Sequence, residues 1–296
     1  MPTLKSVNDI HKRKELYVKT KLKSLSNEVD ILQKDLLSLI IEDFEGKLQL
    51  DASGNIIQNI KNITLTNELD QVFKKFETVF HKDNLAGFGK DLLKLQVFNK
   101  TYYEGLDIEA TTLNRIIQKQ TFIKKRINLY LNELLPMPEV RLKVKNYVLS
   151  AISEGQTYNN YLTGMKQLLE GTAEGKGLLQ KYYTTFVYDT YNEVDAVMNE
   201  HFAENLGLRF FVYTGSVIAT SRRFCIIRAG KVYEISETNK WKCDPTLIGK
   251  PKGVKCDASY NYTQRGRYRC RHYIRFITND LAIRMRPGIK QKFNLN

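Results

Sequence analysis

Apolar residues recur at spacings of three and four along most of the first 200 residues, with charged residues between them. This spacing predicts amphipathic helices. The longest run covers residues 8–44 and stops before Gly46, a residue that commonly ends helices. In residues 48–57, turn-forming side chains lie between two apolar ends, which indicates a short hairpin. Thr157 is expected to cap a further helix that ends near Gly171.

The same period predicts four more helical stretches, the last of which stops at Gly207. They cover residues 69–80, 113–134, 140–152 and 179–198.

After Gly207 the pattern changes to short runs rich in β-forming residues. Residues 209–213 and 273–277 are strand candidates, and Gly230 lies at the expected tip of a hairpin over residues 225–235. Residues 242–267 are polar, contain several Pro and Gly, and indicate a long loop. The predicted fold class is therefore α+β. A mainly helical domain at 1–206 is followed by a small α+β domain at 207–296 with a short antiparallel sheet.

Charge divides the chain at the same place. The 296 residues hold 46 Lys and Arg against 32 Asp and Glu, and residues 201–296 alone hold 19 against 6. All four cysteines and the single tryptophan lie in this basic part. A lopsided positive charge of this size favours nucleic acid or another polyanion as a partner, with a solvated basic face or a protein interface as alternatives.

The amino-terminal residues are charged, and no apolar stretch approaches the length needed to cross a bilayer. We therefore expect no secretion and no membrane partner. Reduced thiols in a cytoplasm are the default for such a chain, so a disulfide is not the favoured state of its cysteines, although a particle released from a cell would meet oxygen.

Enzyme motifs are not convincing in this sequence. Residues 171–177 are glycine-rich, but they have the wrong spacing for a phosphate loop and Gly177 stands where that motif needs Ser or Thr, so a helix-to-helix connection is favoured. There is no His-Glu-x-x-His motif and no Gly-x-Ser-x-Gly elbow. We expect a protein without catalytic residues and without an organic cofactor.

A zinc site is the one cofactor that the residues suggest. Thiolate and imidazole are preferred zinc ligands, and the most economical set is Cys225, Cys270 and His272 with one more cysteine, for which we name Cys243. The cysteine spacings match no standard zinc finger. Buried or merely free thiols are the alternative, because cysteine is among the most buried residue types.

The basic part favours guanidinium groups, which suit bidentate contact with phosphate. The arginines expected to bind nucleic acid or a partner are Arg222, Arg223, Arg228, Arg265, Arg267, Arg269, Arg271 and Arg275. Among them, Arg228 and Arg271 are expected to stay available for acidic partners.

Three segments of the basic part form a recognisable series. The first is Tyr213-Thr214-Gly215. The second runs from Thr220-Ser221-Arg222-Arg223-Phe224-Cys225 through Arg228 to Gly230-Lys231-Val232-Tyr233, and after Trp241 the third is Cys270-Arg271-His272. This series resembles the carboxy-terminal signature of phage minor head proteins, the head morphogenesis family typified by the Mu protein F. The first 200 residues match that family only in being helical.

The resemblance implies a non-enzymatic head morphogenesis protein of the virion. Such a protein docks at the portal vertex inside the capsid and is made in the host bacterial cytoplasm during assembly. Its implied partners are the portal protein, the major capsid or scaffold protein, and double-stranded viral DNA, which the basic domain would contact during assembly or genome delivery. The alternative function is a free basic nucleic-acid-binding protein with a zinc-stabilised C-terminal module.

Overall fold

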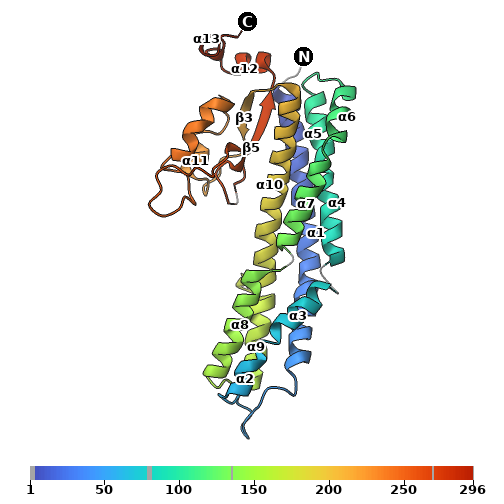
Figure 1. Ribbon diagram of the computed structural model, residues 1–296, viewed down its shortest axis with the longest axis vertical. Coiled ribbons are helices and arrows are strands. Elements are labelled where there is room, and N and C mark those ends of the chain that lie inside the picture. Colours follow the sequence, from blue (N-terminus) through green and yellow to red (C-terminus); the bar gives the residue numbers. More distant parts are fainter. Residues whose placement is uncertain (1–3, 79–81, 135, 269, 296) are drawn as a thin grey trace. The chain divides into compact units, whose positions relative to one another are not determined.

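The structure is a computed structural model that describes residues 4–78, 82–134, 136–268 and 270–295. Within these ranges, ten helices and two strands of two residues each precede residue 207. Figure 1 shows the helices. The helices are α1 (Leu4–Phe44), α2 (Ile60–Leu65), α3 (Leu69–Phe76), α4 (Lys82–Leu93), α5 (Leu95–Glu104), α6 (Ala110–Gln118), α7 (Thr121–Leu134), α8 (Pro138–Ser153), α9 (Tyr158–Glu170) and α10 (Leu178–Leu206).

After residue 207 the chain is mixed. It forms β3 (Phe210–Thr214), α11 (Arg223–Ile226), β4 (Val232–Glu234), the 3-10 helix η2 (Ile235–Cys243), the short 3-10 turn η3 (Tyr262–Gln264), β5 (Tyr273–Ile277), α12 (Asn279–Met285) and α13 (Ile289–Lys292). The predicted α+β class with a short antiparallel sheet is confirmed. Among the described residues, no helix combines the length and the apolar character that crossing a bilayer requires.

Local signals place several helix ends where the sequence predicted them. Helix α1 ends just before Gly46, whose φ of +72° is a conformation that favours glycine. The Thr157 side chain accepts a hydrogen bond from the Asn160 backbone N–H and caps α9. Leu50 and Ile56 form an antiparallel bridge, which confirms the hairpin.

The glycine-rich segment joins two helices, as predicted. Its strands β1 (Gly171–Thr172) and β2 (Gly175–Lys176) pair antiparallel between α9 and α10. At Gly171, φ is +89° and an added Cβ would lie 2.3 Å from the Gly175 carbonyl oxygen, so this tight turn requires glycine.

Two element predictions need correction. Residues 113–134 are not one helix, because the chain breaks at Lys119 and Gln120 between α6 and α7, where the buried Gln120 accepts a hydrogen bond from Gln96. The predicted strand at residues 225–227 is instead part of the single helical turn α11. One turn of helix buries Phe224 and Cys225 together, which an extended strand with alternating faces cannot do.

The chain forms two compact units, each built from separate segments. Unit 1 comprises residues 1–18, 92–127 and 188–296, and unit 2 comprises residues 19–91 and 128–187. The basic module predicted at 207–296 thus shares unit 1 with segments of α1, α5, α6 and α10. In unit 2, residues from α1, α3 and α8 are fully buried, for example Leu36, Phe73 and Val144.

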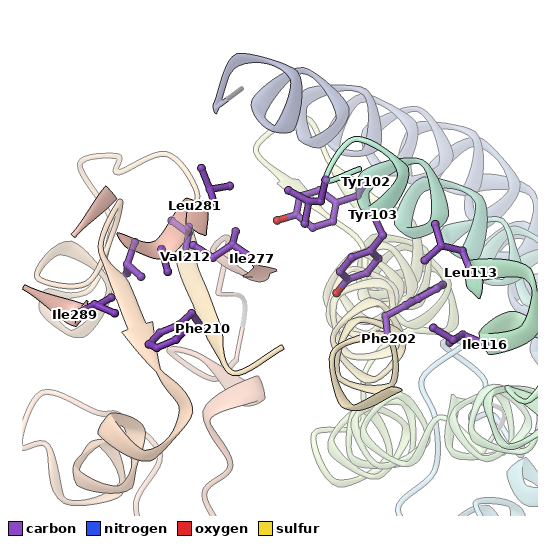
Figure 2. Close-up of a cluster of buried hydrophobic side chains, with 13 residues drawn as sticks. Tyr102, Tyr103, Leu113, Ile116, Phe202, Phe210, Val212, Ile277, Leu281 and Ile289 are labelled. Carbon is purple, nitrogen blue, oxygen red and sulfur yellow. The ribbon is translucent and has the colours of Figure 1, made fainter. Parts of the chain in front are cut away.

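The sheet of unit 1 has the strand order β4-β3-β5, with both pairs antiparallel. Its two faces enter different hydrophobic clusters because side chains alternate along each strand. Phe210, Val212 and Ile277 belong to a cluster with Tyr103 and Phe202 from the helices (Figure 2). The opposite face carries Phe211, Tyr213, Ile274 and Phe276, which pack with Phe224, Cys225, Trp241 and Cys270.

Candidate metal centre

Two segments of the family-like series meet at one buried point of unit 1. Cys225 lies on α11, and Cys270 and His272 lie immediately before β5. The two sulfur atoms are 3.6 Å apart although 45 residues separate them in sequence. The Cys270 sulfur is 3.9 Å from the His272 Nδ1 atom. All three residues are buried and form a cluster that could hold a metal ion.

Tyr213 on β3 also belongs to this cluster, a role that was not predicted from the sequence. Its hydroxyl donates a hydrogen bond to the Cys225 sulfur at 3.4 Å and lies 3.8 Å from the Cys270 sulfur. Its ring stacks on the His272 ring with centroids 5.3 Å apart. The signal was present, because Tyr213 opens the first segment of the series.

Two glycines allow the backbone to close around the cluster. An added Cβ at Gly266 would lie 2.5 Å from the Cys225 sulfur and 3.3 Å from the Cys270 sulfur, and the Gly266 N–H donates to the Cys270 sulfur at 3.3 Å. At Gly215, φ is +129° and an added Cβ would lie 2.9 Å from the His272 Cα atom. Only glycine combines this conformation with so close an approach.

The pKa values of the two thiols are shifted in opposite directions because a hydrogen bond joins them. The hydrogen bond from Cys225 lowers the pKa of the Cys270 thiol, and His272 and the charge of Arg265 act in the same direction against the effect of burial. Its hydrogen bond with Cys270, together with burial, raises the pKa of the Cys225 thiol. The lowered pKa of Cys270 favours its thiolate, the form that ligates metals.

The residues fit a metal by two observations. Two sulfurs bound to one tetrahedral zinc at about 2.3 Å each are roughly 3.8 Å apart, close to the separation found here. The His272 Nε2 atom is buried and has no hydrogen-bond partner among the described residues. Nδ1 is the ring nitrogen that lies near the Cys270 sulfur, and Nε2 is a buried polar atom at the cluster that no described group satisfies.

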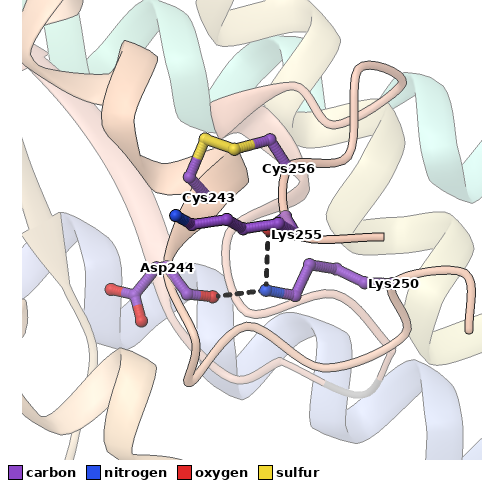
Figure 3. Close-up of a disulfide and its surroundings, with 5 residues drawn as sticks. All are labelled: Cys243, Asp244, Lys250, Lys255 and Cys256. Atoms are coloured by element: carbon purple, nitrogen blue, oxygen red, sulfur yellow. Dashed lines mark hydrogen bonds between the residues drawn. A yellow bond between two sulfur atoms is a disulfide. The ribbon is translucent and has the colours of Figure 1, made fainter. Parts of the chain in front are cut away.

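Cys243 was predicted as the additional ligand, and this prediction is wrong. Cys243 forms a disulfide with Cys256, which closes the loop between η2 and Asp257 (Figure 3). Within this loop, Lys250 donates to the backbone carbonyls of Asp244 at 3.0 Å and Lys255 at 3.3 Å. Reduced thiols were expected for all four cysteines, but these two form a disulfide because the loop brings them together.

Three of the predicted binding arginines are buried and serve the fold. Arg228 pairs with Asp244, and its guanidinium lies 3.7 Å from the centre of the Phe224 ring. The expectation that Arg228 stays available for acidic partners is therefore wrong. Arg265 donates to the Asn192 carbonyl at 3.0 Å, and Arg275 pairs with Asp195.

The other predicted arginines divide into two groups. Arg222 and Arg267 are half-buried and bond to backbone carbonyls, Arg222 to that of Gly266 at 3.0 Å and Arg267 to that of Ile248 at 3.3 Å. Arg223 and Arg271 are exposed. Arg269 lies outside the described residues. Sequence composition could not separate these groups, because buried and exposed arginines have the same letter and similar neighbours.

A buried charge network on the other face of the sheet was not predicted from the sequence. Both Nη atoms of Arg275 donate to the Asp195 carboxylate, at 3.0 and 3.1 Å, and Lys14 from α1 pairs with the same carboxylate. Asn99 donates to its second oxygen at 3.1 Å. Burial raises the pKa of Asp195, while the Asn99 hydrogen bond and the Arg265 charge oppose this. The network ties β5 to α1, α5 and α10 within unit 1.

No family model, curated protein or solved structure matches this chain. The case for its function therefore comes from the site and from the resemblance described above.

Proposed function

We propose that this chain is a non-enzymatic minor head protein of a bacteriophage, acting in head morphogenesis at the portal vertex inside the capsid. The observation that carries the proposal is the convergence of Cys225, Cys270 and His272 with Tyr213 at one buried point. These residues belong to the separate segments on which the resemblance rests. A shared structural centre explains why such segments would keep a common pattern.

The role of this centre in the proposal is structural, with zinc as the metal. Cys225, Cys270 and His272 would hold the ion, and the Tyr213 hydroxyl would donate a hydrogen bond to the Cys225 sulfur beside it. Zinc bound there would supply folding energy and no chemistry. It would fasten α11 to the start of β5.

Contact with packaged DNA, in this proposal, falls to exposed side chains only. Arg223 and Arg271 remain from the predicted arginines, and exposed lysines such as Lys242, Lys252 and Lys255 add to them. Lysines on a surface bind phosphate without reading sequence, as a protein facing a packaged genome requires.

The decisive experiment is co-sedimentation of the full chain with the portal oligomer of the same phage at low and raised salt. Binding that resists salt is expected for a portal-docked protein. Absence of portal binding, together with DNA binding that falls steeply with salt, would replace the proposal with the alternative of a free nucleic-acid-binding protein. The full chain is required, because deleting residues 207–296 would expose Tyr103 and Phe202 of the shared core.

Zinc is tested separately by metal analysis of the purified chain. We expect about one zinc per chain, lost in Cys270→Ser and kept in Cys256→Ser, which removes a cysteine outside the centre. Equal zinc contents in the two variants would contradict the assignment of the ligands.

A further inference from the structure

A groove with a volume of about 830 Å³ lies on unit 1, and Cys225, Cys270 and His272 are not among its lining residues. Its walls come from the edge strand β4, the 3-10 helix η2 and the C-terminal segment that includes α12 and α13. A volume of this size is within the range of ligand-binding clefts. We call it the basic groove; its charged lining residues are Arg228, Lys231, Glu237, Lys240, Arg286 and Lys292.

The basic groove has a net positive charge, and some of its cations form no ion pair within the described residues. Five of the six charged lining residues are cations. The carboxylate of Glu237 pairs with Arg286 and Lys292, and Arg228 pairs with Asp244. Lys231 and Lys240 are exposed and form no ion pair within the described part of the chain. Two ammonium groups are thus left for a negatively charged ligand.

The rest of the lining is apolar and aromatic, with Tyr233, Trp241, Met285 and Phe293 as its largest members. The Trp241 side chain is 4% exposed, and the rings of Tyr233 and Phe224 stand edge-on to it. A base stacks only on an open ring face, so this tryptophan is no platform for single-stranded nucleic acid. Apolar side chains of a peptide, in contrast, need only contact area.

A peptide cannot extend the sheet here, although β4 is an edge strand. Its outward carbonyl at Val232 accepts a hydrogen bond from Arg286 at 3.0 Å, and its outward N–H at Glu234 donates to Glu237 at 2.9 Å. Two outward backbone groups that β-augmentation would need are therefore already bonded within the chain. Recognition has to use side chains.

We propose that the basic groove binds an acidic peptide segment that carries apolar side chains. Carboxylates of the peptide pair with Lys231 and Lys240 at the opening, and its apolar side chains enter against Tyr233, Met285 and Phe293. The inference goes beyond the proposed function and does not depend on it, since the groove stands on its own charge and shape. Portal binding and peptide binding can succeed or fail independently.

The single tryptophan of the chain lies in the groove wall and reports on its occupancy. The test is a fluorescence titration of the full chain at pH 7 with a synthetic nonapeptide in which two glutamates precede each of a leucine, a phenylalanine and a second leucine. A saturable change in fluorescence is expected. A peptide of glutamates alone should bind at least about tenfold more weakly, because it leaves the apolar walls unfilled.

The double variant Lys231→Glu/Lys240→Glu should weaken nonapeptide binding by about tenfold or more, because it reverses both free charges. The matched control is Lys124→Glu, an exposed lysine of unit 1 that does not line the groove, and it should bind as the unchanged chain does. Both lysines of the double variant are exposed, so its melting temperature is expected to stay the same; Lys231→Gln/Lys240→Gln serves as a milder second variant.

Three results would overturn the proposal: no saturable change, equal weakening by Lys124→Glu, or a thymidine oligonucleotide that binds more tightly than the nonapeptide and is weakened by the double variant. The last result would assign the basic groove to nucleic acid.

Discussion

On one face of the sheet β4-β3-β5, Arg275 meets Asp195 and Lys14 in a buried charge network, whereas the other face carries Tyr213 against two thiols and an imidazole. Both arrangements join segments that are distant in sequence. The first depends on one carboxylate that pairs with two cations. The second depends on thiols and an imidazole, which are preferred ligands of a metal.

The two faces should therefore respond differently to mutation, and the size of the loss in stability should differ between them. Removing one member of a buried ion pair leaves the other charge without compensation, which costs several kcal/mol. A larger side chain at the cysteine cluster disrupts its packing, and loss of a ligand weakens metal binding. Neither change should affect the charge network on the opposite face. The exposed edge of the sheet, where Glu237 lies, should respond least.

The largest effect is expected from Asp195→Asn. The amide keeps the shape but leaves Lys14 and Arg275 buried without their carboxylate, so the free energy of unfolding should fall by about 3–5 kcal/mol. Urea denaturation measures this loss. Glu193→Gln, an exposed change on the same helix, is the control and should lie within about 0.5 kcal/mol of the unchanged chain. A loss below about 1 kcal/mol in Asp195→Asn would show that the charged face is not a main stabiliser.

A smaller effect is expected from Gly266→Ala. The new methyl group would lie against the Cys225 sulfur, so the cluster must open, at a cost of about 1–3 kcal/mol. Bound zinc should be lost at the same time. Gly288→Ala is the matched control, because nothing lies within 4 Å of its added Cβ and its φ of −62° suits alanine. If both variants keep the same zinc content and stability, the cluster is looser than its distances indicate.

The smallest effect is expected at Glu237, beside the edge strand β4, whose contribution to stability should be lost in acid. Burial acts to raise the pKa of Glu237, but hydrogen bonds from Arg286 and Lys292 outweigh it and lower this pKa from the usual 4.5 to about 2. The folded state therefore binds fewer protons than the unfolded state between these values. The contribution of Glu237 is fully present above about pH 5 and is lost as the pH falls towards 2.

Melting temperatures of the full chain and of Glu237→Gln, followed from pH 7 to 2, measure this contribution. The difference between them should be greatest near neutral pH and should disappear in acid. A difference that does not change with pH would mean that the role of Glu237 is packing and not charge.

Most helices and the change to β-structure after Gly207 could be predicted from the sequence. Their signals are local: the helical period, the Thr157 cap and the glycines after α1, α9 and α10 act within a few residues. The strand predicted at residues 225–227 failed because apolar Ile226 and Ile227 suit either state, and only the core position of Phe224 selected a helical turn. The predicted candidate ligands Cys225, Cys270 and His272 lie together, whereas Cys243 does not join them.

Which charged residues are buried depends on the folded chain. From the sequence, Arg228 and Arg275 are expected at the surface, yet both are buried because ion pairs with Asp244 and Asp195 offset the loss of solvation. Which acid meets which base depends on contacts 16 and 80 residues apart, and no local pattern encodes those. The pairing of Cys243 with Cys256 and the hydroxyl of Tyr213 beside the two thiols were decided in the same way, by where the folded chain brings distant residues together.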